Sequence, residues 1–167
     1  DMAESSNTLT LRERGIPIHI GHSADNVTDD ISFVIRTAAV HDDNPEVHEA
    51  HRRGIPVFER TQAWGALMRG YQNALCISGT HGKTTTTSMC THIMMAAEKD
   101  PTVMIGGTLP LLKACHRVGK GDTIIMESCE YYNSFLALNP TIAVVLNIEA
   151  DHLDFFKDLE DIKHSFR

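Results

Sequence analysis

The residues with the clearest capacity for chemistry lie in the stretch GTHGKTT at positions 79–85. Gly79 and Gly82 let backbone N–H groups converge on an anion, and the amino end of a following helix adds partial positive charge. Lys83 is placed to reach the terminal phosphates of a nucleotide, and the Thr84 hydroxyl is placed to reach Mg²⁺. The stretch therefore predicts a phosphate-binding loop.

The loop departs from the usual spacing of such motifs. A first glycine is expected five residues before Gly82, and that position is Ile77. A plain turn between a strand and a helix is the alternative interpretation. Such a turn does not need Lys83 and Thr84 directly after two glycines, so a nucleotide-binding loop is the better interpretation.

Two further strand ends carry polar side chains. Glu127 closes the apolar stretch 122–127, where an acid can bind Mg²⁺ directly or through water. His152 follows the apolar stretch 141–147. Ligands of open parallel sheets bind beyond the carboxyl ends of the strands, so we expect Glu127 and His152 to meet Lys83 there. A solvent-facing strand end for Glu127 and a surface or helix-capping histidine are the alternatives.

Alternating strands and helices must position these side chains, and they predict an α/β fold with parallel sheets. Residues 1–71 are expected to form an incomplete Rossmann-like domain. Its predicted strands are 16–20, 31–36 and 55–58, and its predicted helices are 5–14, 45–53 and 61–70. Asn44 is a good amino-terminal cap for the middle helix, since Pro45 occupies the first turn.

Residues 72–167 are expected to form a second domain that contains the loop. Its predicted strands are 74–78, 102–105, 122–127 and 141–147. In the helix after the loop, Met89, Ile93 and Met94 fall on one face, which is expected to pack in the core. A last helix is expected to use its aromatic and aliphatic side chains for burial, namely Phe155, Phe156, Leu159, Ile162 and Phe166.

Composition argues against several classes of function. The net charge is −7 and no basic stripe is visible, so nucleic-acid binding is not expected. No apolar run reaches membrane-spanning length and no secretory leader is visible, so a cytoplasmic protein without membrane insertion is expected. The four cysteines lack the spacing of a zinc site and are expected to be reduced thiols.

Three motifs, in this order, resemble the Mur ligase family. They are GTHGKTTTTSM at 79–89, GDTIIMESCEYYNSFL at 121–136 and NIEADHLDFF at 147–156. The stretch at 37–57, TAAVHDDNPEVHEAHRRGIPV, is similar to the family's uridine-nucleotide domain. The loop of this family is the shorter Gly-Thr-x-Gly-Lys-Thr form, which accounts for the residue at position 77. His81 separates this loop from those of members that add later amino acids.

The resemblance implies an ATP-dependent amide ligase of peptidoglycan precursor synthesis that joins L-alanine to UDP-N-acetylmuramate through an acyl phosphate. The catalytic residues it implies are Lys83, Glu127 and His152. The Mg²⁺ ligands it implies are Thr84, Glu127 and His152. The ATP-binding residues it implies are Gly79, Thr80, His81, Gly82, Lys83, Thr84 and Thr85. The UDP-sugar contacts it implies are Thr37, Ala38, Asn44 and Glu130.

The chain departs from the family pattern in extent and in detail. It starts after the glycine-rich turn that cradles the diphosphate and stops within the ATP-binding domain, so it is expected to be a truncated fragment that is inactive alone. Cys129, Tyr131 and Tyr132 stand where the family commonly has more acids. An exposed edge of an incomplete sheet would invite self-association, so the sequence leaves a homodimer open.

Three alternative functions follow from the same residues. The first is a ligase that recycles murein peptides, although NIEADHLDFF fits the L-alanine-adding enzyme better. The second is a non-catalytic phosphate-loop module, which would favour a standard first glycine and an aspartate in place of Glu127. The third is an independent UDP-sugar-binding protein, in which Lys83 and Thr84 would have no use.

Overall fold

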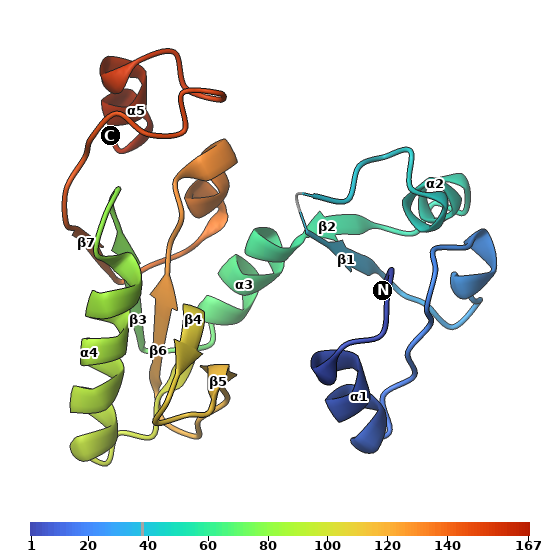
Figure 1. The fold of residues 1–167 in the computed structure, drawn as a ribbon, viewed down its shortest axis with the longest axis horizontal. Helices are drawn as coiled ribbons and strands as arrows, with labels where there is room; N and C mark the ends of the chain where they lie inside the picture. Colours follow the sequence, from blue (N-terminus) through green and yellow to red (C-terminus); the bar gives the residue numbers. More distant parts are fainter. Residues whose placement is uncertain (38) are drawn as a thin grey trace. The chain divides into compact units, whose positions relative to one another are not determined.

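The computed structural model describes residues 1–37 and 39–167, and the chain forms two compact units, Asp1–Ala63 and Trp64–Arg167 (Figure 1). Both units contain parallel strands joined through helices, as the alternating pattern predicts. The α/β fold class is therefore confirmed.

The first unit contains a two-stranded parallel sheet. β1 (Val34–Arg36) pairs with β2 (Val57–Glu59), and α2 (Pro45–Arg52) forms the crossover between them. The Asn44 side chain accepts a hydrogen bond from the Glu46 N–H at 3.0 Å, which confirms the predicted cap. Two short elements precede this sheet, α1 (Ser6–Glu13) and the 3₁₀ turn η1 (Ala24–Asn26).

The strand predicted at 16–20 does not form. In the described part of the chain, these residues follow α1 without regular secondary structure. The terminal amine donates to the His19 carbonyl at 2.9 Å, and the Gly21 N–H donates to the Asp1 carbonyl at 2.8 Å. Local apolar alternation produces a strand only where a neighbouring strand supplies a ladder of hydrogen bonds, and here only isolated bonds are made.

The second unit is built on a five-stranded sheet of order β5-β4-β6-β3-β7. Its strands are β3 (Asn73–Ser78), β4 (Thr102–Leu109), β5 (Ala114–Arg117), β6 (Thr123–Glu127) and β7 (Ile142–Val145). All pair in parallel except β5, which runs antiparallel to β4. The sequence predicted neither β5 nor the continuation of β4 through Gly106 and Gly107.

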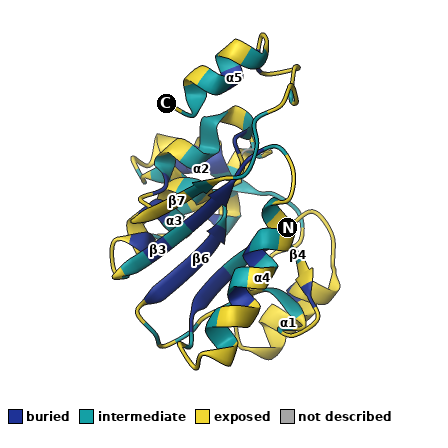
Figure 2. Cartoon of the chain, turned by 90° about the vertical axis from the view of Figure 1, so that its left-hand side faces the viewer, coloured by how far each residue is buried: buried dark blue, intermediate teal, exposed yellow. Residues whose placement is uncertain are grey.

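The central strands of this sheet are covered on both faces (Figure 2). On one face, α3 (Arg60–Met68) brings Met68 to a cluster formed by Ala74, Cys76, Ile124, Met126 and Leu138. On the other, α4 (Lys83–Ala96) contacts β3, β4 and β6. Burial raises the pKa of the Cys76 thiol to about 11, as expected for a reduced core cysteine.

The buried face of α4 is not the one that the apolar pattern predicts. Met89 is 59% exposed and Ile93 is 64% exposed, whereas Thr87 and Thr91 are fully buried. The helix begins directly at the loop, where Lys83 bonds the loop carbonyls and Thr84 bonds Glu127 of β6, so these contacts fix which face of the helix meets the sheet. Loop geometry thus overrides the hydrophobic pattern here.

The last part of the chain follows β7 and holds α5 (Leu159–Ser165). Phe156 and Ile162 are buried as predicted, while Phe155 is 37% exposed. Both phenylalanines precede the helix instead of lying within it. No helix of the described residues is long and apolar enough to cross a membrane.

Candidate functional site

The candidate loop joins the end of β3 to the start of α4. Gly79 has a φ of +126° and Gly82 a φ of +87°, both conformations that disfavour side chains. A Cβ atom on Gly79 would lie 2.9 Å from the carbonyl oxygen of Asn147, so the loop needs glycine there to pass this backbone. Both predicted glycines are therefore favoured by their positive φ, and Gly79 is also needed because the loop passes close to the backbone of Asn147.

Asn147, just beyond β7, ties down the centre of the loop. Its Oδ1 accepts from the His81 N–H at 2.8 Å, and its Nδ2 donates to the His81 carbonyl at 3.0 Å. Its carbonyl oxygen also accepts from the Thr80 N–H at 3.1 Å. The N–H groups of Thr80 and His81 are thus occupied. The first N–H groups of α4, which include those of Thr84 and Thr85, lack partners within the helix.

Lys83, the first residue of α4, folds back over the loop. Its Nζ donates to the carbonyl oxygens of Gly79 at 2.6 Å and Thr80 at 3.2 Å. It also pairs with Glu130 Oε2 at 3.3 Å, and the Glu130 side chain is only 3% exposed. The structure therefore places Glu130 against the lysine of the loop, a partnership that sequence reasoning did not find.

Thr84 and Glu127 meet at the end of β6. The Thr84 hydroxyl lies 2.9 and 3.0 Å from the two oxygens of Glu127, and the Gly106 N–H donates to Glu127 Oε2 at 2.7 Å. Thr84 is exposed and Glu127 is half-buried. The structure thus brings together two of the three residues expected to bind a metal.

His152 follows β7 and lies against Tyr131, the residue after Glu130. Its ring stacks on Tyr131, with centroids 4.4 Å apart and an interplanar angle of 23°. Among the described residues, no hydrogen bond or ion pair joins it to Thr84 or Glu127. Hydrogen bonds to Asp154 and then Tyr132 raise the pKa of the Tyr131 phenol, so the ring that holds His152 stays neutral.

The residues expected to contact a UDP-sugar belong mainly to the first unit. Thr37 is exposed just after β1, and Asn44 is engaged as the helix cap. Ala38 lies outside the described residues, so its expected role is not addressed by the structure. No hydrogen bond between described side chains links Thr37 to Asn44.

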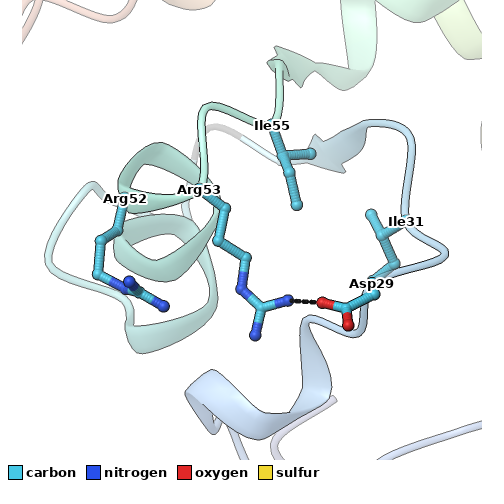
Figure 3. Close-up of a pocket in the computed structure, with 5 residues that line it drawn as sticks. All are labelled: Asp29, Ile31, Arg52, Arg53 and Ile55. Atoms are coloured by element: carbon cyan, nitrogen blue, oxygen red, sulfur yellow. Dashed lines mark hydrogen bonds and ion pairs between the residues drawn. The ribbon is translucent and has the colours of Figure 1, made fainter.

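A surface hollow of about 530 Å³ lies at the other end of the same two strands (Figure 3). It is lined by residues that precede β1 and β2 or end α2, namely Asp29, Ile31, Arg52, Arg53 and Ile55. Arg53 pairs with Asp29 at 2.8 Å and with Glu49 at 2.6 Å. Arg52 also pairs with Glu49 at 2.6 Å, so both arginines of the hollow have carboxylate partners within the protein.

Comparison with known families accounts for nearly the whole chain. The Mur ligase middle domain matches residues 77–167, and the description "Mur ligase family, catalytic domain" matches residues 1–72. The chain belongs to the Mur ligase family. The loop that Lys83 closes and the acid of β6 are thus parts of a Mur ligase, in the order that the three sequence motifs predict.

Individual Mur ligases resemble this chain over almost all of its length. The UDP-N-acetylmuramate–L-alanine ligase of Agathobacter rectalis is 49% identical over 167 residues, which are 100% of this chain and 36% of that protein. The crystal structure of the UDP-N-acetylmuramate–alanine ligase of Thermotoga maritima matches with a TM-score of 0.87 and 34% identity, covering 99% of this chain and 39% of that one. The chain thus spans about a third of the length of its curated relatives.

A more distant Mur ligase shares the fold. The UDP-N-acetylmuramate:L-alanyl-γ-D-glutamyl-meso-diaminopimelate ligase of Neisseria meningitides matches with a TM-score of 0.82 but only 22% identity, covering 99% of this chain and 57% of that one. This likeness concerns the fold alone.

Two residues of the site escaped prediction, although each left a signal. Asn147 ends a strongly apolar stretch, where a polar side chain is free to reach the neighbouring loop. Gly106 lies inside β4, and a glycine within a strand often marks close approach of another group. Both act on a residue far away in the sequence, which local patterns do not reveal.

Proposed function

We propose that these residues form part of an ATP-dependent ligase that joins L-alanine to UDP-N-acetylmuramate in the cytoplasm. The observation that carries the proposal is the meeting of Thr84 and Glu127 beside the loop that Lys83 closes. The identity of 49% to a relative named for this reaction supports the choice of substrates.

In the proposed reaction, the γ-phosphoryl group of ATP passes to the carboxylate of UDP-N-acetylmuramate. The amine of L-alanine then attacks the acyl carbon, an amide bond forms, and the carbon–oxygen bond to phosphate breaks. ADP and phosphate are released. Catalysis of such a transfer is mainly positioning and charge neutralisation, so the residues that hold phosphate and metal carry most of it.

Lys83 is proposed to contact the β- and γ-phosphates. Its ammonium group now bonds two loop carbonyls and Glu130, so it lies over the loop, where phosphates would bind. The free N–H groups at the start of α4 add hydrogen-bond donors and the positive end of the helix dipole. The start of α4 and Lys83 are therefore the groups of this part of the chain that are proposed to bind the anion.

The donor set of Thr84 and Glu127 fits Mg²⁺, because both supply oxygen. Among the described residues, no cluster of three His, Cys, Asp or Glu side chains could hold a metal. Mg²⁺ is often held by one or two protein ligands together with substrate phosphates, and Thr84 and Glu127 would supply two. When bound there, Mg²⁺ would neutralise charge on the transferring phosphoryl group. A ligand role for His152, whose ring stacks on Tyr131, stays a prediction.

The test uses the full-length ligase that carries these residues. Phosphate release from ATP is measured with UDP-N-acetylmuramate and either L-alanine or the tripeptide L-alanyl-γ-D-glutamyl-meso-diaminopimelate. We expect release only with L-alanine. Release only with the tripeptide would replace the proposal by a murein-peptide ligase, and release with neither would leave a nucleotide-binding module.

A further inference from the structure

Gly106 stands beside the Glu127 carboxylate, on the strand next to it in the sheet. β4 pairs in parallel with β6, with Met104 opposite Met126, so the two residues lie just beyond this register at the same edge. The Gly106 N–H donates to Glu127 Oε2 at 2.7 Å. Gly106 is therefore the neighbour that holds one carboxylate oxygen while Thr84 approaches both.

The missing side chain of Gly106 matters as much as its N–H. A Cβ atom built there would lie 2.8 Å from both carboxylate oxygens and 2.9 Å from Cδ of Glu127. Contacts this short cannot be kept, so any side chain would push the carboxylate away. The backbone of Gly106 is not in the left-handed region, so conformational freedom does not explain the glycine.

Gly107 provides an internal comparison. A Cβ atom there would lie 3.6 Å from Cγ2 of Thr84, which is an ordinary van der Waals contact. The two adjacent glycines thus differ in what they leave room for. Only a side chain at Gly106 would clash with Glu127, the acid of β6.

We propose that Gly106 is a positioning residue for metal binding: its N–H orients the Glu127 carboxylate toward Thr84, and its lack of a side chain leaves the space that the carboxylate occupies. The inference rests on the proposed function, because it assumes that Glu127 and Thr84 bind Mg²⁺ together with a nucleotide. Gly106 itself touches neither the metal nor the nucleotide. Its contribution is the direction in which the carboxylate points.

The experiment compares Gly106→Ala with Gly107→Ala in the full-length ligase. ADP binding is measured by isothermal titration calorimetry, once with saturating Mg²⁺ and once with EDTA. In Gly106→Ala we expect the strengthening of ADP binding by Mg²⁺ to fall by about tenfold or more, as for other losses of residues that orient metal ligands. Binding in EDTA should stay unchanged, because Lys83 and the loop are untouched, and Gly107→Ala should behave like the wild type.

The outcomes separate this inference from the proposed function. If the wild-type ligase binds no ADP in either condition, the proposed function fails and the inference fails with it. If the wild type binds ADP more tightly with Mg²⁺ and Gly106→Ala keeps the full effect, only the inference is overturned. Loss of ADP binding in EDTA by Gly106→Ala would also overturn it, because the role would then be general support of the site.

A second variant covers the case in which Gly106→Ala does not fold. Glu127→Asp withdraws the carboxylate by one methylene and so makes room for the added methyl group. We expect Glu127→Asp alone to weaken the Mg²⁺ effect, and the further addition of Gly106→Ala to change it little. If Gly106→Ala weakens the Mg²⁺ effect as much in Glu127→Asp as it does in the wild type, the two residues do not interact and the inference is overturned.

Discussion

The ion pair of Lys83 and Glu130 links phosphate chemistry to stability at the level of single residues. The Lys83 side chain is 13% exposed and that of Glu130 is 3% exposed, so water reaches little of either charge. Removing one member of such a pair leaves the other charge buried without a partner. A variant at Lys83 therefore changes two properties at once.

We expect Lys83→Ala to lower the free energy of unfolding by about 3 kcal/mol, because the buried Glu130 carboxylate loses its cation. The double variant Lys83→Ala/Glu130→Gln should recover most of this loss while still failing to bind nucleotide. Urea denaturation followed by circular dichroism measures the stability, and calorimetry measures the binding. If the single and double variants are equally stable, the pair contributes nothing to the fold.

At the scale of elements, the sequence predicted those features that depend on neighbouring residues. The glycine–lysine–threonine stretch located the loop and the start of α4, and Asn44 with Pro45 located α2. The strand β6 was predicted to end at its acid, as it does. In each case the side chains that fix the element lie within a few residues of it.

The features that the sequence did not predict depend on distant partners. The face of α4 is set by the loop and the sheet, so the apolar Met89 and Ile93 lie outward although their spacing predicts burial. β5 forms because the free edge of β4 supplies backbone hydrogen-bond partners. Its own residues do not form a marked strand pattern. The contact of Gly106 with Glu127 joins two strands, and neither strand reveals it alone.

The buried face of α4 yields a prediction about two threonines. The Thr91 hydroxyl donates to the Thr87 carbonyl at 2.8 Å, whereas the Thr87 hydroxyl is the fully buried side-chain polar atom that has no partner among the described residues. Valine has nearly the same shape as threonine. Thr87→Val should therefore raise the free energy of unfolding by about 1 kcal/mol, because an unsatisfied buried hydroxyl is removed.

Thr91→Val serves as the matched control on the same helix face, one turn further along. It removes a hydroxyl that does have a partner, so stability should stay equal or fall slightly. Thermal and urea unfolding of both variants measure the difference. A Thr87→Val variant less stable than the wild type would mean that its hydroxyl is satisfied in solution.

At the scale of the whole molecule, each unit holds a carboxylate whose pKa is lowered by arginine. In the first unit, hydrogen bonds from Arg52 and then Arg53 lower the pKa of Glu49 to about 2. In the second, Arg117 lowers the pKa of Asp100. The single tryptophan, Trp64, packs against the core cluster of the second unit, so its fluorescence reports on that unit while circular dichroism reports on both.

Glu49 should therefore make the first unit sensitive to acid. Its pKa is about 2 in the folded chain against an ordinary value of 4.5, so the unfolded chain takes up a proton first as the pH falls. The stability that Glu49 contributes is thus fully present above about pH 4.5 and is lost as the pH falls through about 2. We expect Glu49→Gln to be less stable than the wild type at pH 7 and to lack this part of the pH dependence.

Urea denaturation between pH 7 and pH 2 measures this for the wild type, Glu49→Gln and the control Glu160→Gln, which changes an exposed carboxylate in the second unit. The circular dichroism transition of Glu49→Gln should approach that of the wild type as the pH falls, because protonation of Glu49 removes the same interaction. The transition seen by Trp64 should not change between these two proteins. Parallel loss of stability in the wild type and Glu49→Gln over the whole range would show that the two arginines do not hold Glu49 ionised in the folded chain.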